Sequence, residues 1–361
     1  MSLRHLVDFN ELTAEEWEGI YSLAADIKKN PANYSEACKG KILATLFYEP
    51  STRTMLSFQT AMLRLGGNVI GFDNPENSSV SKGENLKDTI TIISCYADII
   101  AMRNPKEGAA LAASLFSSRP IINAGDGGHF HPTQTLIDMF TIRQKKDTLS
   151  GLTIGLCGDL KNGRTVHSLL RALNTLGKNT YYLISTESLA LQSHIIDALR
   201  ENGNTVYEVT SLEECMDKLD VLYMTRIQKE RFESEEQYKA QSGLYILDKE
   251  KMDMAKSDMI VLHPLPRVDE ITEEVDYDPR AMYFKQVQNG LYVRMALIMK
   301  MLEAREGEKE SLDIEKYMDL PREQHCKSNV CVTKTENYLP LLTYKTPDGK
   351  TACMYCDHII D

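Results

Sequence analysis

The sequence predicts an α/β protein with two doubly wound parallel-sheet domains and a small C-terminal β module built around four cysteines. Short apolar runs alternate with amphipathic helical segments, which is typical of βαβ units and parallel sheets. The alternation stops near residues 147–151 and then starts again, which indicates a second domain. Four of the eight cysteines crowd into the C-terminal end. A length of 361 residues also suits two domains plus a small addition.

The first domain is expected to open with a helix and to continue through four strands. Residues 13–16 (TAEE) form a capping box, and Trp17, Ile20 and Ala24 follow at helical spacing, so this helix should end near Asn30. Strands are predicted at residues 42–47, 68–72, 98–102 and 120–124. Helices are predicted between them, at residues 52–65, 84–96 and 107–116.

The second domain repeats the pattern. Strands are predicted at residues 152–157, 180–184, 206–209, 221–224 and 259–262, with a helix at 164–176. A last amphipathic helix at 289–305 is expected to return to the first domain, which gives domains 1–138 and 139–288. Residues 306–323 are charged and are interpreted as a linker. Residues 324–361 are too few to be held together by an apolar core alone.

Charge and composition exclude several classes of protein. The chain has 41 Lys and Arg against 52 Asp and Glu, a net charge of −11, which disfavours nucleic acid as a partner. Its start has no basic stretch followed by an apolar run, and no apolar window is long enough for a membrane span. Free thiols without a secretion signal indicate a cytoplasmic location and no membrane partner.

The most specific motif is YEPSTRT at residues 48–54, between a predicted buried strand and a helix. The first turn of a helix leaves backbone N–H groups unpaired and carries partial positive charge, so it binds anions. Ser51, Thr52 and Thr54 add hydroxyl donors, and the Arg53 guanidinium can hold a phosphate with two hydrogen bonds. An ordinary serine helix cap is the alternative for this motif.

Three further motifs lie in the first domain, two of them at the ends of predicted strands and one in a loop before a predicted helix. Residues 131–135 (HPTQT) come after the small-residue turn at 123–128, so His131 and Gln134 should lie at the carboxyl edge of the sheet. A structural histidine before proline is the alternative. Residues 78–84 (SSVSKGE) and 102–105 (MRNP) are a polar loop and an arginine turn, and both are also common as plain surface features.

The second domain carries three more candidate motifs. Residues 158–168 (GDLKNGRTVHS) lack the middle glycine of a dinucleotide fingerprint, because Leu160 stands there. Residues 224–230 (MTRIQKE) and 263–267 (HPLPR) also follow strands, and the two prolines predict a rigid turn for which a cis bond is one form. Six cations are expected at these edges, which predicts anionic substrates and electrostatic catalysis without a catalytic metal or cofactor: Arg53, Lys82, Arg103, Arg164, Arg226 and Arg267.

These seven motifs, in this order, resemble the carbamoyltransferase family from about residue 6 to residue 304. Residues 48–54, 102–105 and 131–134 are similar to its carbamoyl phosphate site. The other four motifs resemble members that use aspartate. Members that use ornithine have a cysteine in the loop corresponding to residues 263–267, and this chain has none there. The resemblance therefore implies transfer of a carbamoyl group to L-aspartate, the committed step of de novo pyrimidine biosynthesis.

The resemblance also implies roles for individual residues. Carbamoyl phosphate would contact Ser51, Thr52, Arg53, Thr54, Arg103, His131, Gln134, Leu265 and Pro266. L-Aspartate would contact Lys82, Arg164, Arg226 and Gln228. The catalytic set would be Arg53, Thr54, Lys82, Arg103 and His131. Ser78 and Lys82 would come from a neighbouring subunit of a homotrimer.

The C-terminal cysteines form two close pairs, Cys326 with Cys331 and Cys353 with Cys356. This spacing suits a tetrahedral structural Zn²⁺ site, with disulfides or unrelated thiols as alternatives. His325 and His358 are interpreted as bystanders. The segment resembles the zinc domain of the family's regulatory chain without its nucleotide-binding domain. We therefore expect little response to ATP or CTP, and a higher homo-oligomer through the module stays open.

A rival interpretation is a binding protein, in which the four-cysteine ribbon recruits a nucleic acid or a protein onto an inactive scaffold. The acidic composition disfavours nucleic acid, and all the motifs of the resemblance are complete, which disfavours an inactive scaffold.

Overall fold

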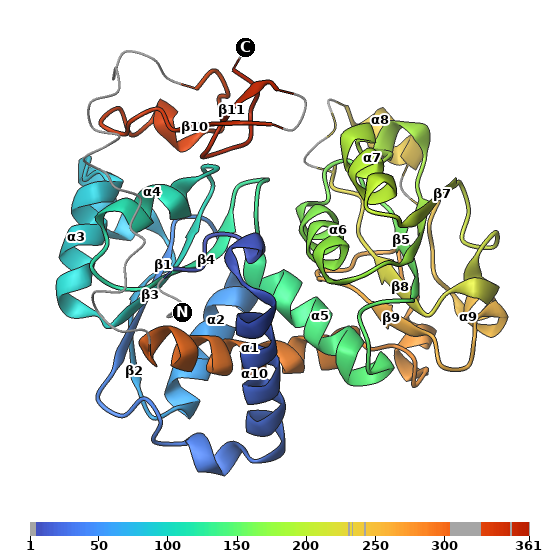
Figure 1. Cartoon of the computed structure of the whole chain (residues 1–361), viewed down its shortest axis with the longest axis horizontal. Helices are drawn as coiled ribbons and strands as arrows, with labels where there is room; N and C mark the ends of the chain where they lie inside the picture. Colours follow the sequence, from blue (N-terminus) through green and yellow to red (C-terminus); the bar gives the residue numbers. More distant parts are fainter. Residues whose placement is uncertain are drawn as a thin grey trace. The chain divides into compact units, whose positions relative to one another are not determined.

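The computed structural model describes residues 5–303 and 326–360, except residues 230, 231, 233, 242, 347 and 348. It divides into two compact units (Figure 1). The first unit comprises Met1–Thr133 and Leu291–Asp361, and the second comprises Gln134–Gly290. The predicted linker at 306–323 and His325 lie outside the described residues.

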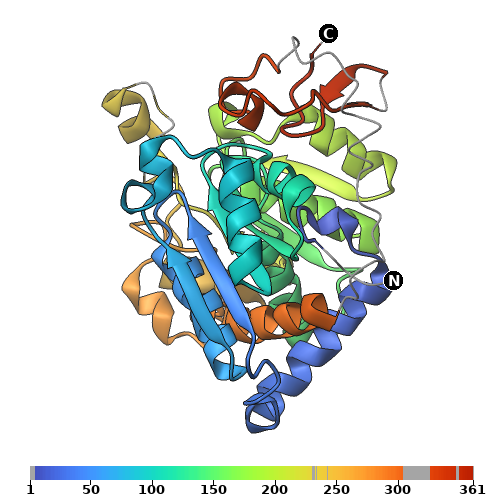
Figure 2. The same ribbon diagram turned by 90° about the vertical axis from the view of Figure 1, so that its left-hand side faces the viewer.

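The first unit is built on a parallel sheet of order β2-β1-β3-β4. Its strands are β1 (Ile42–Phe47), β2 (Asn68–Phe72), β3 (Ile99–Asn104) and β4 (Ile121–Asp126). Its helices are α1 (Ala14–Lys29), α2 (Thr52–Arg64), α3 (Leu86–Tyr96) and α4 (Ala109–Phe116). Figure 2 shows the neighbouring strands β1 and β2 running in the same direction. Strand β1 is an unbroken apolar run apart from one threonine because a central parallel strand is buried on both faces.

The second unit has a parallel sheet of order β7-β6-β5-β8-β9. Its strands are β5 (Thr153–Cys157), β6 (Thr180–Ile184), β7 (Thr205–Val209), β8 (Val221–Met224) and β9 (Ile260–Leu262). Its helices include α6 (Arg164–Leu176), α7 (Ser193–Glu201), α8 (Glu235–Gln241) and α9 (Lys249–Met254). The predicted fold class of two parallel-sheet α/β domains is confirmed. Within the described residues no helix is both long and apolar enough to cross a membrane.

Two helices differ from the sequence prediction. Helix α5 (Pro132–Lys146) was not expected as one helix, because the residues that it buries include Thr133, Asp138 and Thr141, and these polar residues break the apolar stripe. Helix α10 (Tyr283–Glu303) begins well before the predicted residue 289, and its early turn buries the polar Gln286. The two units divide within these helices, at 133/134 and 290/291, where domain boundaries of 138/139 and 288/289 were expected.

The C-terminal module belongs to the first unit (Figure 1). We call residues 326–360 the metal module. Its regular structure is an antiparallel pair, β10 (Thr343–Lys345) and β11 (Thr351–Cys353), with a 3₁₀ turn at Val332–Lys334. All four of its cysteines and Tyr355 lie in the same apolar cluster as Leu86 of α3 and Ala109 of α4. The module is therefore stabilised by the core of the first unit, which a segment of this size needs.

Candidate active site and metal centre

The turn at residues 48–54, which we call the anion turn, joins β1 to α2. Ser51 occupies the N-cap position of α2, but its side chain makes no capping hydrogen bond. The alternative of an ordinary serine cap is therefore wrong, and the first-turn N–H groups of α2 keep their capacity to bind an anion. Thr52 and Arg53 are exposed at this end of the helix, whereas Thr54 is buried.

Arg103 lies beside the anion turn because β1 and β3 pair in register, with Phe47 opposite Arg103. One of its terminal nitrogens lies 2.7 Å from the carboxylate of Glu49, and the other donates to the Ala124 carbonyl at 3.4 Å. Its Nε is buried and has no hydrogen-bond partner. The guanidinium is thus held in place by the protein and still has a donor to offer.

The positive charge of Arg103 affects the pKa of Arg53. Although Arg53 is exposed as a whole, partial desolvation of its guanidinium lowers its pKa, and the nearby Arg103 cation lowers it further. Two guanidinium groups that repel each other at the N-terminus of a helix favour a multiply charged anion between them, because the anion removes the repulsion.

His131 lies at the end of the loop that joins β4 to α5, here called the β4–α5 loop (residues 127–131). Its side chain is 6% exposed, and its Nδ1 lies 3.3 Å from the hydroxyl of Thr133. Strand β4 is the neighbour of β3, so His131, which follows β4, and Arg103, near the end of β3, lie at the same edge of one sheet. This is the edge at which parallel α/β sheets bind ligands.

Ser78 and Lys82 lie on a separate polar turn. The Ser78 hydroxyl accepts from the N–H of Val80 and donates to the Pro75 carbonyl. Lys82 is exposed at the end of the 3₁₀ turn Ser79–Lys82. None of the hydrogen bonds or ion pairs found among the described residues connects Lys82 to the anion turn.

In the second unit, Arg164 and Arg226 follow two paired strands, β5 and β8. Arg164 is the first residue of α6, and Arg226 comes two residues after the end of β8. Gln228 Nε2 donates to the Asn162 carbonyl at 3.2 Å, which ties the loop of Arg226 to the loop of Arg164. Both arginines are half-buried. Two guanidinium groups on linked loops suit a ligand with two carboxylates.

Gln134 and Leu265 are joined by a buried polar network. Asp138 Oδ1 accepts from Nε2 of Gln134 at 2.7 Å and from Nε2 of Gln286 at 2.6 Å. Gln286 Oε1 in turn accepts from the N–H of His263 at 3.0 Å, and His263 Nδ1 accepts from the N–H of Leu265 at 2.7 Å. The Leu265–Pro266 bond is cis, one of the forms considered from sequence. This network holds the Gln134 side chain and the Leu265 backbone to one hub.

The hub of this network is the buried carboxyl group of Asp138. Asp138 is fully buried, and burial raises its pKa to about 7, although hydrogen bonds from Tyr223, Gln286 and Gln134 oppose this. Asp138 and Glu49 were both missed from sequence. Asp138 had one available signal, since it lies four residues after Gln134 and so on the same face of a helix.

Arg267, the sixth expected cation, is already paired. Its guanidinium binds the Asp276 carboxylate through two nitrogens, and it also donates to the hydroxyl of Tyr283. The positive charge of Arg267 is therefore neutralised by Asp276. Arg267 therefore stabilises the turn after residue 263 and does not serve as a free anion ligand here.

Comparisons with known proteins agree with this geometry. A family model described as aspartate/ornithine carbamoyltransferase, carbamoyl-P binding domain, matches residues 4–144. The corresponding Asp/Orn binding domain matches residues 150–301. The chain belongs to the aspartate/ornithine carbamoyltransferase family. It is similar to the aspartate carbamoyltransferase catalytic subunit of Clostridium botulinum, with 59% identity over 300 residues, which are 83% of this chain and 98% of that protein.

Solved structures of carbamoyltransferases show the same fold. The catalytic subunit of aspartate transcarbamoylase from M. jannaschii has a TM-score of 0.79 and 48% identity, over 84% of this chain and all of that chain. The aspartate transcarbamoylase from Trypanosoma cruzi, in complex with carbamoyl phosphate and aspartate, has a TM-score of 0.78 and 37% identity. That match covers 83% of this chain and 97% of the other.

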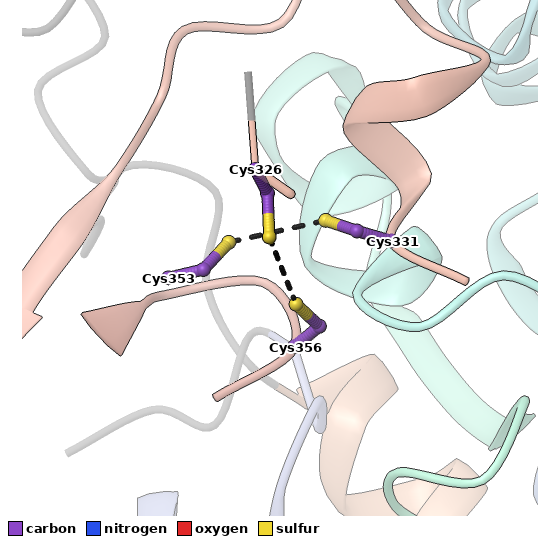
Figure 3. Close-up of side chains that lie close together, drawn as sticks. All are labelled: Cys326, Cys331, Cys353 and Cys356. Atoms are coloured by element: carbon purple, nitrogen blue, oxygen red, sulfur yellow. Dashed lines mark hydrogen bonds between the residues drawn. The ribbon is translucent and has the colours of Figure 1, made fainter. Parts of the chain in front are cut away.

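The metal module of this carbamoyltransferase lies beyond the residues matched by the family models, which end at residue 301. Its four cysteine side chains converge on one point (Figure 3). Their sulfur atoms all lie within 4.8 Å of one another, and all four residues are buried. Hydrogen bonds from Cys353 and Cys356 lower the pKa of Cys331, so a thiolate is favoured there. Four converging sulfurs can hold a metal ion, and His358 contacts the site through its backbone, with its carbonyl accepting from the N–H of Cys353 at 2.9 Å.

Proposed function

We propose that this chain transfers the carbamoyl group of carbamoyl phosphate to the α-amine of L-aspartate, giving N-carbamoyl-L-aspartate and phosphate. The observation that carries the proposal is the pair of cationic half-sites. Arg53 and Arg103 flank a helix N-terminus in the first unit, and Arg164 and Arg226 lie on linked loops in the second. A relative with 37% identity has carbamoyl phosphate and aspartate bound in its solved structure. The reaction is the committed step of pyrimidine biosynthesis.

The first half-site would bind carbamoyl phosphate. Ser51, Thr52, Arg53 and Thr54 hold the phosphate together with first-turn N–H groups of α2. Arg103 bridges the phosphate and the carbonyl oxygen. Its buried, unpartnered Nε supports this role, because an anion oxygen supplies the missing acceptor. Carbamoyl phosphate has to compete with Glu49 for the terminal nitrogen of Arg103.

The carbonyl carbon would be attacked directly by the amine of aspartate. Thr54, Arg103 and His131 stabilise the oxyanion of the tetrahedral intermediate, and phosphate leaves with a proton taken from the amine. Gln134 and the backbone at Leu265 and Pro266 bind the carbamoyl NH₂ group. The network through Asp138 supports their joint role, since it joins both to one carboxyl group.

The second half-site would bind aspartate, with Arg164 and Arg226 on its two carboxylates and Gln228 beside them. Both substrates are anions and repel each other in water. Most of the rate enhancement would therefore come from holding them together in a reactive geometry. No cofactor takes part in these steps.

Ser78 and Lys82 would complete the site of a neighbouring subunit in a homotrimer. The exposure of Lys82 supports this, because the described contacts do not tie it to the anion turn of its own chain. Lys82 would then contact aspartate and act in catalysis in the active site of the neighbouring subunit.

Zinc would occupy the four-cysteine site as a structural ion. Four thiolates leave no open position for a substrate, and Cys₄ sites of this spacing are typical of Zn²⁺. Thiolate ligands also fit a reducing, cytoplasmic location.

The test is a carbamoyl transfer assay with the purified full-length chain, comparing L-aspartate with L-ornithine as acceptor. The protein is produced in a host without its own carbamoyltransferase. We expect turnover with aspartate, and Arg53→Ala should abolish it and so serve as the control for contaminating enzyme. Activity with ornithine alone, or none with either acceptor, would show that the proposal is wrong.

A further inference from the structure

We propose that Asp357 of the metal module is a positioning residue for the β4–α5 loop, which carries His131. The inference rests on the proposed function for its kinetic part only. Its structural basis is a histidine held between two carboxylates, one from each side of the interface between the module and the catalytic fold. His129 Nε2 lies 3.2 Å from Asp357 Oδ2, and His129 Nδ1 lies 3.4 Å from Asp126 Oδ2.

The His129 ring is enclosed, and its two carboxylate neighbours favour the protonated imidazole. Its side chain is 10% exposed, so neither contact is a loose surface pair. Burial lowers the pKa of His129, but the hydrogen bonds with Asp126 and Asp357 outweigh this and raise it to about 10. A protonated imidazole donates from both ring nitrogens, and each nitrogen has one carboxylate as acceptor. The pair of hydrogen bonds therefore fixes the ring from both sides.

Asp126 transmits this constraint to the loop. Asp126 is 1% exposed, and its carboxylate also accepts from the N–H groups of Phe130 at 2.9 Å and Gly108 at 2.9 Å. The N–H of His129 donates to the Asp126 carbonyl at 3.0 Å. The backbone from 126 to 130 is thus held by one buried aspartate, and His131 follows at once. The contact between His129 and Asp357 connects the module to this arrangement.

Asp357 is itself held rigidly by the metal module. It directly follows Cys356, its N–H donates to the Cys353 carbonyl at 2.9 Å, and its other carboxylate oxygen accepts from the hydroxyl of Tyr344 at 2.9 Å. Its φ of 58° is a left-handed conformation that aspartate and asparagine tolerate better than other non-glycine residues. A metal ion in the cysteine site would stabilise this turn, because such small modules fold with their metal. The state of the metal module then affects the order of the β4–α5 loop.

The experiment compares Asp357→Asn, His129→Gln and the double variant in the full chain. Asparagine keeps the left-handed turn and removes the charge. Lys345→Gln, an exposed change on β10 of the same module, is the matched control. Two measurements are made on each protein: hydrogen exchange of the peptide that contains residues 126–131, and the steady-state kinetics of carbamoyl phosphate use.

We expect each single variant to speed exchange in that peptide and to lower kcat/KM for carbamoyl phosphate by about tenfold, the effect of losing one charge-assisted hydrogen bond. The double variant should be no worse than His129→Gln alone, since that substitution already removes the contact with Asp357 together with the contact with Asp126. Lys345→Gln should match the unmodified protein.

Unchanged exchange in Asp357→Asn, or full additivity in the double variant, would overturn the proposal. Faster exchange with normal kinetics would also overturn the proposal, because the contact between His129 and Asp357 would then order the loop without affecting catalysis. A chain without carbamoyl transfer activity would instead refute the proposed function. The exchange data would still decide whether the contact between His129 and Asp357 orders the β4–α5 loop.

Discussion

Arg53 and Arg103 illustrate, at the scale of single residues, how an acidic protein prepares a site for an anion. Arg53 lies in the first turn of α2 and Arg103 near the end of β3, and the charge of Arg103 lowers the pKa of Arg53. Glu49 neutralises part of Arg103 at 2.7 Å. The net charge of −11 therefore says little about this site, where two cations and a helix N-terminus are concentrated.

Replacing Arg226 by alanine should weaken the use of aspartate selectively. Loss of a guanidinium–carboxylate contact costs about 1.5–3 kcal/mol, which corresponds to an increase of about 10- to 100-fold in the KM for aspartate. The KM for carbamoyl phosphate should change less than about twofold, within the scatter of distant substitutions. Initial rates measured against each substrate in turn check this.

Arg200→Ala is the matched control, since Arg200 is an exposed arginine of the same unit that pairs with Glu208 at 3.5 Å. Its kinetics should be unchanged. An Arg226→Ala protein with normal aspartate saturation would remove Arg226 from the proposed site.

Asp138 should make the protein less stable as the pH rises. Its pKa of about 7 in the fold exceeds its ordinary value of 3.8, so between these pH values the folded chain holds a proton that the unfolded chain has lost. The contribution of Asp138 to the free energy of unfolding then falls by about 1.4 kcal/mol per pH unit up to about pH 7. Asp138→Asn removes this titration.

Urea unfolding at pH 5 and pH 7 measures the effect. Between these pH values the unmodified protein should lose about 2–3 kcal/mol more than the Asp138→Asn variant. Asp197→Asn, an exposed change on α7, should keep the unmodified pH dependence. Equal pH dependence in all three proteins would mean that Asp138 titrates normally.

At the scale of elements, the metal module docks on the start of α4. The N–H of Glu107 donates to the Val330 carbonyl and the N–H of Val332 donates to the Glu107 carbonyl, both at 2.9 Å. Next to this pair, Gly108 has a φ of 79°, and a Cβ there would lie 2.4 Å from the Tyr355 carbonyl oxygen. Only glycine allows the module to approach so closely.

Gly108→Ala should therefore loosen the docked module. The cost combines the strain of a positive φ with a backbone clash, and overpacking of this kind adds about 1–3 kcal/mol. Gly40→Ala is the matched control, because Gly40 has a φ of 78° and nothing within 4 Å of an added Cβ. The comparison thus separates the clash from the backbone strain.

Thermal unfolding and protease sensitivity of the module measure the difference. Gly108→Ala should lower the midpoint more than Gly40→Ala and expose the module to cleavage. Equal effects of the two substitutions would mean that a clash with Tyr355 adds nothing to the loss of stability.

At the scale of the whole molecule, the metal module is part of the first unit and supports two of its helices. The first turn of α3 has two N–H groups satisfied by the module: Leu86 donates to the Glu336 carboxylate at 3.2 Å and Lys87 to the Tyr338 hydroxyl at 2.8 Å. The ring of Tyr338 also packs edge-on against Phe116 of α4, with ring centres 5.7 Å apart. A loss of order in the module should therefore spread to α3 and α4.

The four cysteines can hold a metal ion, and chelating an ion bound there should speed hydrogen exchange in α3 and α4 by about tenfold or more, as expected when local stability falls by about 1.4 kcal/mol. Strand β5 at the centre of the second unit should be unaffected. Exchange followed by mass spectrometry before and after chelation, and after zinc is restored, checks this. If α3 and α4 exchange at the same rate with and without metal, the order of the metal module does not stabilise these helices.

Much of the fold follows from the sequence because its signals are local. Buried parallel strands are short apolar runs, and β1, β6 and β8 lie where strands were predicted from such runs. The anion turn and the four cysteines were found for the same reason, since their chemistry depends on neighbours in the chain. The sequence by itself thus determined the fold class, the family resemblance and the candidate site residues.

Only the tertiary structure decided which groups meet across the chain. Helices α5 and α10 bury polar side chains such as Asp138 and Gln286, and these are stable there because they bond to each other and to further buried groups of the same network. The ion pair of Arg267 and the clamp on His129 likewise join residues that no local pattern relates. Long-range hydrogen bonds form wherever the packed fold brings donor and acceptor together, so their partners cannot be inferred from spacing alone.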